Sequence, residues 1–173
     1  LEARDLKKFI KPDQKLVGLF VNADINVIQH LIEFCGLDFI QLHGNEPIEY
    51  MKELKKFNKP IIKAIPVKNH SDIVESNKFK NYCDMILFDT KTNQTAYGGT
   101  GISFDWNLLK GYYSSRDWML AGGINKDNIY EALDVTNAPI VDISSGVEKS
   151  KGVKCELLIK DFMKVLRNYE KKK

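Results

Sequence analysis

Short apolar segments alternate with longer amphipathic segments along almost the whole sequence, and this alternation restricts the folds open to the chain. The apolar segments are rich in Val, Ile, Leu and Phe, and polar or glycine-containing residues follow each one; they are 16–21, 39–43, 60–67, 85–89, 118–122 and 140–144. Between them, apolar residues recur at three- and four-residue spacing, as in helices with one buried face, at 27–32, 48–57, 129–133 and 158–169. Strands that alternate with helices predict a parallel sheet covered by helices.

Such a sheet is either an open doubly wound sheet or a closed barrel, and the positions of the polar residues favour the barrel. Asn22, His43, Asp89, Gly122 and Ser144 lie at or just after the ends of predicted strands. In a TIM barrel this end is the active-site face, and the last two loops commonly bind phosphate. A dinucleotide-binding sheet would need a glycine-rich turn after its first strand, which residues 21–24 do not provide. We therefore predict a TIM (β/α)8 barrel with about six of its eight βα units present.

Length and composition agree with a single domain over residues 1–173, which the strand pattern predicts to be a phosphate-binding barrel that is N-terminally incomplete. The composition also excludes several classes of partner. The net charge is +3, and the lysine-rich end is predicted to be a solvated helix end rather than a nucleic-acid site. Cys35, Cys83 and Cys155 are odd in number and lack metal-ligand spacing, so neither disulfides nor a metal site is expected. No apolar segment approaches the ~20 residues of a membrane helix. A cytoplasmic protein without a membrane partner is predicted.

Small residues follow the last two predicted strands and indicate an anion site. They are Gly122, Gly123, Ser144, Ser145 and Gly146. Residues without bulky side chains allow a phosphate to approach backbone amides closely, and a helix N-terminus adds a favourable dipole. The alternative is that both segments are merely tight turns between strand and helix. Their occurrence in two successive units favours phosphate binding.

Asp89 is the candidate acid of the site. It ends the apolar segment 85–89, and period-two alternation places Met85, Leu87 and Asp89 on one face, the predicted barrel interior. A carboxyl group partly removed from water at the rim of a barrel is suited to donate a proton. The alternative is a structural carboxylate that caps a loop or pairs with Lys91.

Three other strand-end side chains are candidate ligand contacts. Gln41 and His43 share one face of their strand and are expected to point into the barrel, although a histidine here is also compatible with a purely structural role. Asp142 shares its face with Ser144 and is expected to contact a bound ligand or to support a neighbouring group. Cys83 precedes its strand, so it belongs at the opposite end of the barrel and is expected to be inert.

A glycine-rich segment follows Asp89 and is a candidate lid over the site. Its residues are Tyr97, Gly98, Gly99 and Gly101. Glycines permit hinge-like changes and close backbone approach, although an ordinary flexible connection would have a similar composition.

Six segments together resemble the phosphoribosylanthranilate isomerase family over nearly the whole chain. They are 17–22, 41–46, 87–91, 97–101 with 104–106, 120–124 and 141–148. Each segment alone is weak evidence, but six in the family's order are specific. The resemblance assigns Asp89 as general acid. Another phosphate-handling barrel, such as an epimerase or a synthase, would share the glycine and serine turns but not the segments 89–91 and 97–101 together.

The resemblance implies an Amadori rearrangement in tryptophan biosynthesis. N-(5-phosphoribosyl)anthranilate is converted to 1-(2-carboxyphenylamino)-1-deoxyribulose 5-phosphate: an acid opens the furanose ring to a Schiff base, and a base then removes the C2 proton. The partner is therefore a small phosphorylated substrate, no cofactor is needed, and the enzyme is expected to be a monomer or a homodimer.

The sequence departs from the family at its start. The family's first strand carries a Lys-Ile-Cys-Gly-like motif whose cysteine is the base, and an arginine near the second strand contacts the anthranilate carboxylate; neither is present in this sequence. We expect roughly 30 to 40 residues to precede Leu1 in the working enzyme and to supply two strands, a helix and the cysteine. This chain alone is expected to be inactive. The alternative is a non-catalytic, truncated phosphate-binding barrel whose open edges need a partner or a dimer.

Overall fold

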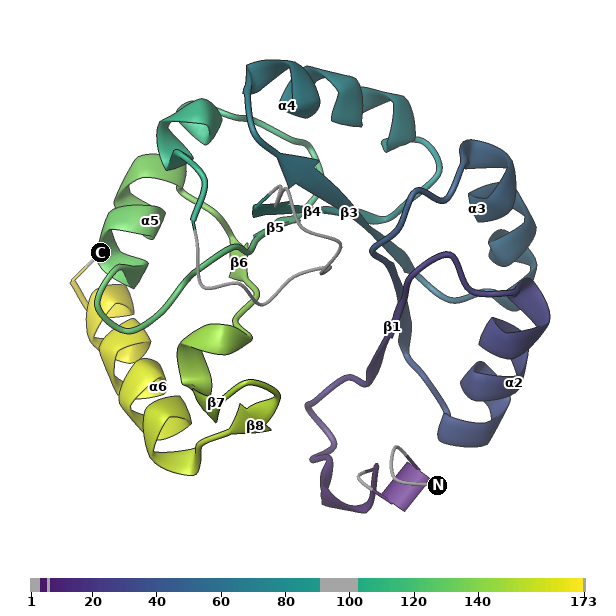
Figure 1. Ribbon diagram of the computed structural model, residues 1–173, viewed down its shortest axis with the longest axis horizontal. Helices are drawn as coiled ribbons and strands as arrows, with labels where there is room; N and C mark the ends of the chain where they lie inside the picture. Colours follow the sequence, from purple (N-terminus) through teal and green to yellow (C-terminus); the bar gives the residue numbers. More distant parts are fainter. Residues whose placement is uncertain (1–3, 6, 91–102, 173) are drawn as a thin grey trace. The chain divides into compact units, whose positions relative to one another are not determined.

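The structure, a computed structural model, describes residues 4–5, 7–90 and 103–172 (Figure 1). Six strands form one sheet in the order β1-β2-β3-β4-β5-β6, which is also their order along the chain. The chain divides into two compact units. Unit 1 comprises Leu1–Ala64 and Lys78–Ile86, and unit 2 comprises Ile65–Asn77 and Leu87–Lys173.

Unit 1 contains two complete strands with the helices that follow them. Its elements in order are η1 (Lys7–Phe9), β1 (Val17–Phe20), α2 (Ile25–Cys35), β2 (Phe39–Leu42), α3 (Ile48–Leu54) and η2 (Lys55–Phe57), followed by the first part of β3 (Ile61–Val67) and the start of β4 (Met85–Thr90). β1 pairs in parallel with β2, and β2 with β3. The helices α2 and α3 lie on one side of these strands (Figure 1).

Helix α2 shows how the local sequence sets an element's ends. The Asp24 side chain accepts a hydrogen bond from the Asn26 amide at 2.7 Å and caps the first turn. Gly36 adopts the left-handed conformation at φ 65°, and its amide donates to the Ile32 carbonyl, which ends the helix. Ile28 and Ile32 of the predicted apolar face are buried one turn apart, whereas Val27, which was assigned to the same face, is 49% exposed.

Two carboxylates accept backbone hydrogen bonds at the starts of strands in unit 1. Asp38 precedes β2 and accepts a hydrogen bond from the Leu16 amide at 2.8 Å, just before β1. Asp84 precedes β4 and accepts from the Ile61 amide at 2.8 Å, at the start of β3. In each case the carboxylate before one strand satisfies an amide at the start of another.

Unit 2 holds the ends of β3 and β4 and the remaining elements. They are α4 (His70–Ser76), η3 (Asn77–Phe79, which begins here), η4 (Trp106–Leu109), β5 (Trp118–Leu120), α5 (Ile129–Thr136), β6 (Ile140–Val141), η5 (Ser145–Val147), β7 (Glu148–Ser150), β8 (Val153–Lys154) and α6 (Glu156–Glu170). β5 and β6 are parallel, whereas β7 and β8 form a separate antiparallel hairpin. No helix among the described residues is long and apolar enough to cross a membrane.

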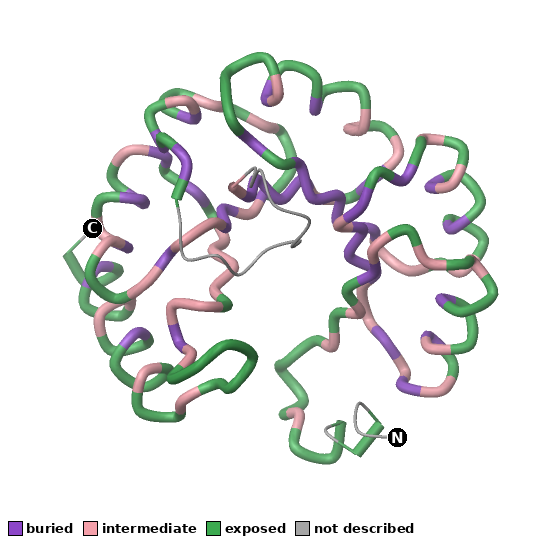
Figure 2. The backbone as a smooth tube through the Cα atoms, in the orientation of Figure 1, coloured by how far each residue is buried: buried purple, intermediate pink, exposed green. Residues whose placement is uncertain are grey.

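Most apolar residues of β2 to β5 and the inner faces of the helices are buried (Figure 2), whereas Val17 and Leu19 of β1 are 40% and 57% exposed. In unit 1, Ile40, Leu42 and Ile61 are fully buried. In unit 2, Phe88 packs edge to face against Tyr112 and Trp118, with ring centroids 5.1 and 5.7 Å away. This aromatic packing holds β4 beside β5, the strand that leads into the glycine turn of the candidate site.

The predicted order of strands and helices is confirmed, with three differences. The strands β5 and β6 end two and three residues before their predicted ends at 122 and 144. Helix α4 was not predicted, although Asn69 and Asp72 form a capping box at its start. The hairpin of β7 and β8 was not predicted either, because its residues are mostly polar and show no alternation.

Candidate active site

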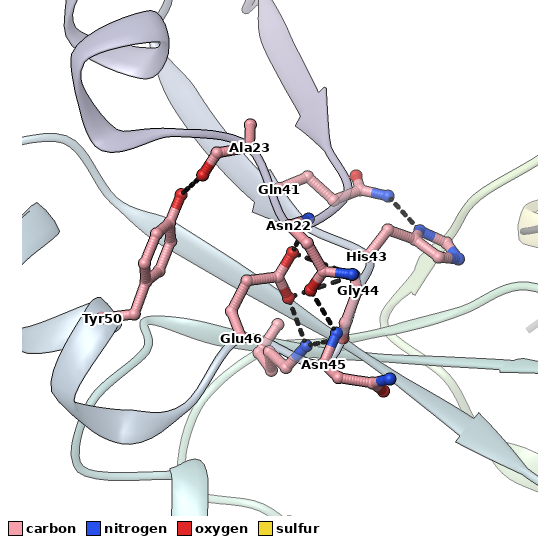
Figure 3. Close-up of polar contacts among 9 residues, drawn as sticks. Asn22, Ala23, Gln41, His43, Gly44, Asn45, Glu46 and Tyr50 are labelled. Carbon is pink, nitrogen blue, oxygen red and sulfur yellow. Dashed lines mark hydrogen bonds and ion pairs between the residues drawn. The ribbon is translucent and has the colours of Figure 1, made fainter.

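In unit 1, Gln41 and His43 lie at the carboxyl end of β2, on one face as predicted. Gln41 is buried and His43 half-buried, and the Gln41 amide nitrogen lies 3.2 Å from Nδ1 of His43 (Figure 3). The His43 amide donates to the Phe20 carbonyl at 2.8 Å, which extends the pairing of β1 with β2. Both the backbone and the ring of His43 therefore have defined partners.

A buried carboxylate organises the loop after His43, and the sequence analysis missed it. Glu46 Oε1 accepts hydrogen bonds from the amides of Asn22 at 2.8 Å and Gly44 at 3.1 Å (Figure 3). Oε2 accepts from Lys63 Nζ at 2.9 Å, and Lys63 also donates to the Gly44 carbonyl at 2.6 Å. A β-carbon on Gly44 would lie 2.7 Å from Glu46 Oε1, so a side chain here would have to displace the Glu46 carboxylate. The available signal was the lysine inside the apolar strand 61–65.

The electrostatics of this loop favour an ionised Glu46. Burial would raise the pKa of the Glu46 carboxyl, but the Asn22 amide and the Lys63 ammonium more than compensate, so the pKa lies below its ordinary value of 4.5. Next to it, burial and the negative charges of Glu46 and Asp24 raise the pKa of Tyr50 to about 12. The Tyr50 hydroxyl therefore stays protonated and donates to the Ala23 carbonyl at 2.7 Å.

The lowered pKa of Glu46 predicts an acid-sensitive contribution to stability. A carboxyl group whose pKa is lower in the folded than in the unfolded state stabilises the fold above the unfolded value and loses this contribution as the pH falls through the folded value. We expect the free energy of unfolding, measured with urea, to fall below pH 4.5. In Glu46→Gln this part of the pH dependence should be missing. An unchanged slope in that variant would assign the acid sensitivity to other carboxylates.

In unit 2, Asp89 lies at the end of β4 and beside the first glycine turn. It is 9% exposed, and its Oδ1 accepts a hydrogen bond from the Thr90 amide at 2.7 Å. A β-carbon on Gly122 would lie 2.9 Å from the Thr90 nitrogen and 3.2 Å from Asp89 Oδ1. Gly122 and Gly123 adopt φ values of 87° and 69°, which side chains disfavour. The structure thus brings the candidate acid and the glycine turn together.

The second turn packs closely on the first. A β-carbon on Gly146 would clash with the Ile124 carbonyl oxygen and would lie 3.0 Å from the Asn125 α-carbon. Ser144 is exposed, and Ser145 and Gly146 are half-buried. The absence of a side chain at position 146 therefore lets the two turns lie side by side, as the prediction of one anion site requires. Asp142 lies at the end of β6, where its amide donates to the Leu120 carbonyl at 2.8 Å.

Lys154 is a further residue of this region that the sequence analysis did not identify. Its Nζ donates to Ser144 Oγ at 2.8 Å and to Glu148 Oε1 at 2.7 Å. Glu148 and Lys154 lie opposite each other in the hairpin of β7 and β8. The contact with Lys154 and the Gly152 amide lower the pKa of Glu148. Opposite charges six residues apart around Gly152 were the available signal.

The remaining candidates fall into two groups. The predicted lid residues, from 97 to 101, lie outside the described residues. Cys83 is buried before β4, with its thiol directed to the Phe79 carbonyl at 3.3 Å, which agrees with a packing role; Cys35 is also buried, and Cys155 is half-buried before α6. Within the described ranges, no group of His, Cys, Asp and Glu is arranged to hold a metal ion.

An acid at a strand end, two glycine-containing turns after the last strands, and helices after most parallel strands are the features of an α/β barrel with its site at the carboxyl ends of the strands. Residues 2–165 match the family model described as N-(5'-phosphoribosyl)anthranilate isomerase, and the chain belongs to this family. The isomerase of Bradyrhizobium sp. strain BTAi1 is 37% identical over 171 residues, which are 97% of this chain and 78% of that protein.

Solved structures agree with this assignment. The crystal structure of phosphoribosyl anthranilate isomerase from Thermotoga maritima is similar with a TM-score of 0.86 and 36% identity, covering 96% of this chain and 80% of that one. A structure of the isomerase in complex with reduced 1-(o-carboxyphenylamino)-1-deoxyribulose 5-phosphate has a TM-score of 0.81 and 32% identity, covering 96% and 78%. The predicted fold class, a TIM barrel with about six of the eight βα units in this chain, is confirmed.

Proposed function

We propose that the protein is a phosphoribosylanthranilate isomerase that performs the Amadori rearrangement of N-(5-phosphoribosyl)anthranilate in tryptophan biosynthesis. The observation that carries the proposal is the position of Asp89, a carboxyl group at the end of β4 directly beside Gly122. A phosphorylated sugar held at the glycine turn would place its ring next to this acid. The family to which the chain belongs and the complex of a related enzyme with a reduced product analogue support the same substrate.

Asp89 would act as the general acid of the first step. Its proton passes to the furanose ring oxygen, the C1–O bond breaks, and the anthranilate nitrogen supplies the electron pair that forms the Schiff base. Loss of the C2 proton then gives the enolamine, which tautomerises to the ketone. The hydrogen bond from the Thr90 amide to Oδ1 restrains the orientation of the carboxyl group that donates this proton. The second proton transfer needs a base, and none of the site residues described above takes that role.

The phosphate group would be bound mainly by backbone. Gly122 and Gly123 expose the amides of the first turn, and Ser144, Ser145 and Gly146 form the second turn against it. Lys154, held over Ser144, adds a positive charge that the substrate phosphate can share with Glu148. Gln41, His43 and Asp142 remain proposed contacts for the sugar and the anthranilate. A cytoplasmic location belongs to the proposal, because a phosphorylated sugar does not cross a membrane unaided.

The experiment that tests the function uses the complete gene product that contains this chain. We expect it to restore growth without tryptophan to a strain that lacks the isomerase and, when purified, to convert the substrate to the 1-deoxyribulose product observed by chromatography. Binding of the reduced product analogue without any turnover would support the non-catalytic alternative instead. Light scattering of the same preparation decides between monomer and homodimer.

Replacement of Lys154 tests the phosphate site at its edge. Lys154→Met should raise KM about two- to five-fold with little change in kcat, since one partly exposed charge contributes modestly and salt screens it. The difference from the wild type should shrink as the salt concentration increases. Lys160→Met, which removes an exposed ion pair within α6, is the matched control and should leave KM unchanged. Equal effects of both variants would show that Lys154 does not act on the phosphate.

A further inference from the structure

A buried ion pair in unit 1 connects the loops after β1 and β2 to Lys63, the third residue of β3. The side chains of Lys63 and Glu46 are 3% and 1% exposed, and their charged atoms are 2.9 Å apart. Lys63 belongs to β3, Glu46 follows β2, and Asn22, whose amide donates to Glu46, follows β1. Figure 3 shows the Glu46 carboxylate directed at the backbone of Asn22 and Gly44, while the Gln41 amide is directed at the His43 ring.

The energetics of the pair indicate that its role is geometric. A buried ion pair is often no more stabilising than apolar side chains of the same volume, because removing two charges from water is costly. Charges do provide directional hydrogen bonds, which apolar side chains do not. Here these bonds reach the Asn22 amide, the Gly44 amide and the Gly44 carbonyl. The pair therefore fixes loop backbone that packing alone would leave free to shift.

The backbone fixed in this way is the backbone that carries His43. Gly44 follows His43 directly, its amide is held by Glu46, and its carbonyl is held by Lys63. On the other side, the His43 amide is paired with Phe20. The peptides before and after His43 are thus both restrained, and the ring is restrained in turn by Gln41.

The pair does not share the strand face of the proposed substrate contacts. In the register of β2 and β3, Lys63 is aligned with Leu42 and Ile62 with Gln41. Since side chains alternate along a strand, Lys63 lies on the face opposite to Gln41 and His43. Any effect of Lys63 on a ligand at His43 must therefore pass through the backbone of the loop.

We infer that Lys63 and Glu46 are positioning residues of the isomerase, which hold the peptide after His43 so that the imidazole meets the substrate in a single orientation. This inference rests on the proposed function and adds to it a dependence of His43 on a buried pair from the opposite face of the strands. Small displacements of a substrate-positioning group are costly, about 10²-fold in rate for about 1 Å.

The experiment compares Lys63→Met and Glu46→Gln with Asp38→Ala in the complete gene product. Asp38 is the matched control, because its replacement removes a carboxylate bond to backbone at the other end of the same strands. All variants are measured at a temperature at which circular dichroism shows them folded. If a single variant does not fold, Glu46→Gln combined with Lys63→Met replaces it, since this pair buries no charge and keeps similar volume.

Two readouts separate positioning from stability. The protein has three histidines, so the ring Cε1–H signals in an NMR spectrum are few, and His43→Asn identifies the signal of His43. We expect Lys63→Met and Glu46→Gln to shift this signal and to leave those of His30 and His70 in place, while Asp38→Ala shifts none. We also expect kcat/KM to fall about 10- to 100-fold in the wild-type background and less than about two-fold further in His43→Asn.

The inference is overturned if the His43 signal stays in place in the folded variants, or if their loss of kcat/KM is the same with and without His43. The same holds if His43→Asn alone leaves kcat/KM unchanged. A wild-type protein without turnover would instead refute the proposed function, and the NMR comparison would still decide whether the pair fixes His43.

Discussion

Replacing Asp89 with Asn is expected to lower kcat by about 10²- to 10⁴-fold with little change in substrate affinity. The amide keeps the size of the carboxyl group and can still accept the hydrogen bond from the Thr90 amide, which lies 2.7 Å from Oδ1. It has no proton to transfer to the ring oxygen. The lost interaction is one made in the transition state, so steady-state kinetics should show the change in kcat and not in KM.

Two further measurements make this result specific. Asp134→Asn is the matched control: its carboxylate accepts a hydrogen bond from the Tyr169 hydroxyl at 2.7 Å in the helical layer of the same unit, and kcat should be unchanged. The pH profile of kcat in Asp89→Asn should lose the limb of an essential acid and keep that of the base. Near-normal turnover with an unchanged profile would make Asp89 structural, and Asp142 and His43 would be the next candidates.

Gly146→Ala is expected to lower kcat/KM by about 10²-fold, mainly through KM. The added methyl group would meet the Ile124 carbonyl oxygen and lie 3.0 Å from the Asn125 α-carbon, and neither backbone atom can move without moving the first turn. The two turns would separate, and their amides would no longer converge on one phosphate. Isothermal titration with the reduced product analogue should show the same loss as KM.

Gly111→Ala separates this effect from a general loss of stability. Gly111 has φ 74°, and a β-carbon there would meet no atom within 4 Å, so alanine strains the backbone by roughly 1 kcal/mol without pushing on a neighbour. We expect it to lower the melting temperature and to leave KM unchanged. If Gly146→Ala changes only the melting temperature as well, the second turn does not bind phosphate.

The elements with the clearest sequence signals are those that bury both faces. In β4, a continuous apolar segment ends at a single acid, and both the strand and the position of Asp89 could be predicted. Helix α4 gave a weaker signal, because it buries only Ile73 and Ser76 and one of these is polar. The strand β6 has two residues in regular pairing, although the apolar pattern continues to Ile143. Pattern alone does not show where the pairing of a strand stops.

Contacts between distant side chains mark the limit of sequence reasoning at the site. A lysine within the apolar strand 61–65 indicates that a buried charge needs a partner. The sequence does not show which of the nearby carboxylates is that partner, since Glu46 is 17 residues away and in a loop. Likewise, the glycine at 146 was predicted to admit a phosphate, whereas the structure shows that it first admits the Ile124 carbonyl.

The carboxylates of Asp38 and Asp84 bear on how pieces of such a chain can be exchanged. Each one completes the hydrogen bonding at the start of a strand to which it does not belong. A fragment that begins at β2 itself, without the preceding Asp38, would leave the Leu16 amide of its neighbour without this acceptor. When such a unit is recombined or duplicated, its boundary should therefore lie before the aspartate, in the turn that ends the previous helix. Each strand then keeps the carboxylate that accepts a hydrogen bond from the neighbouring strand.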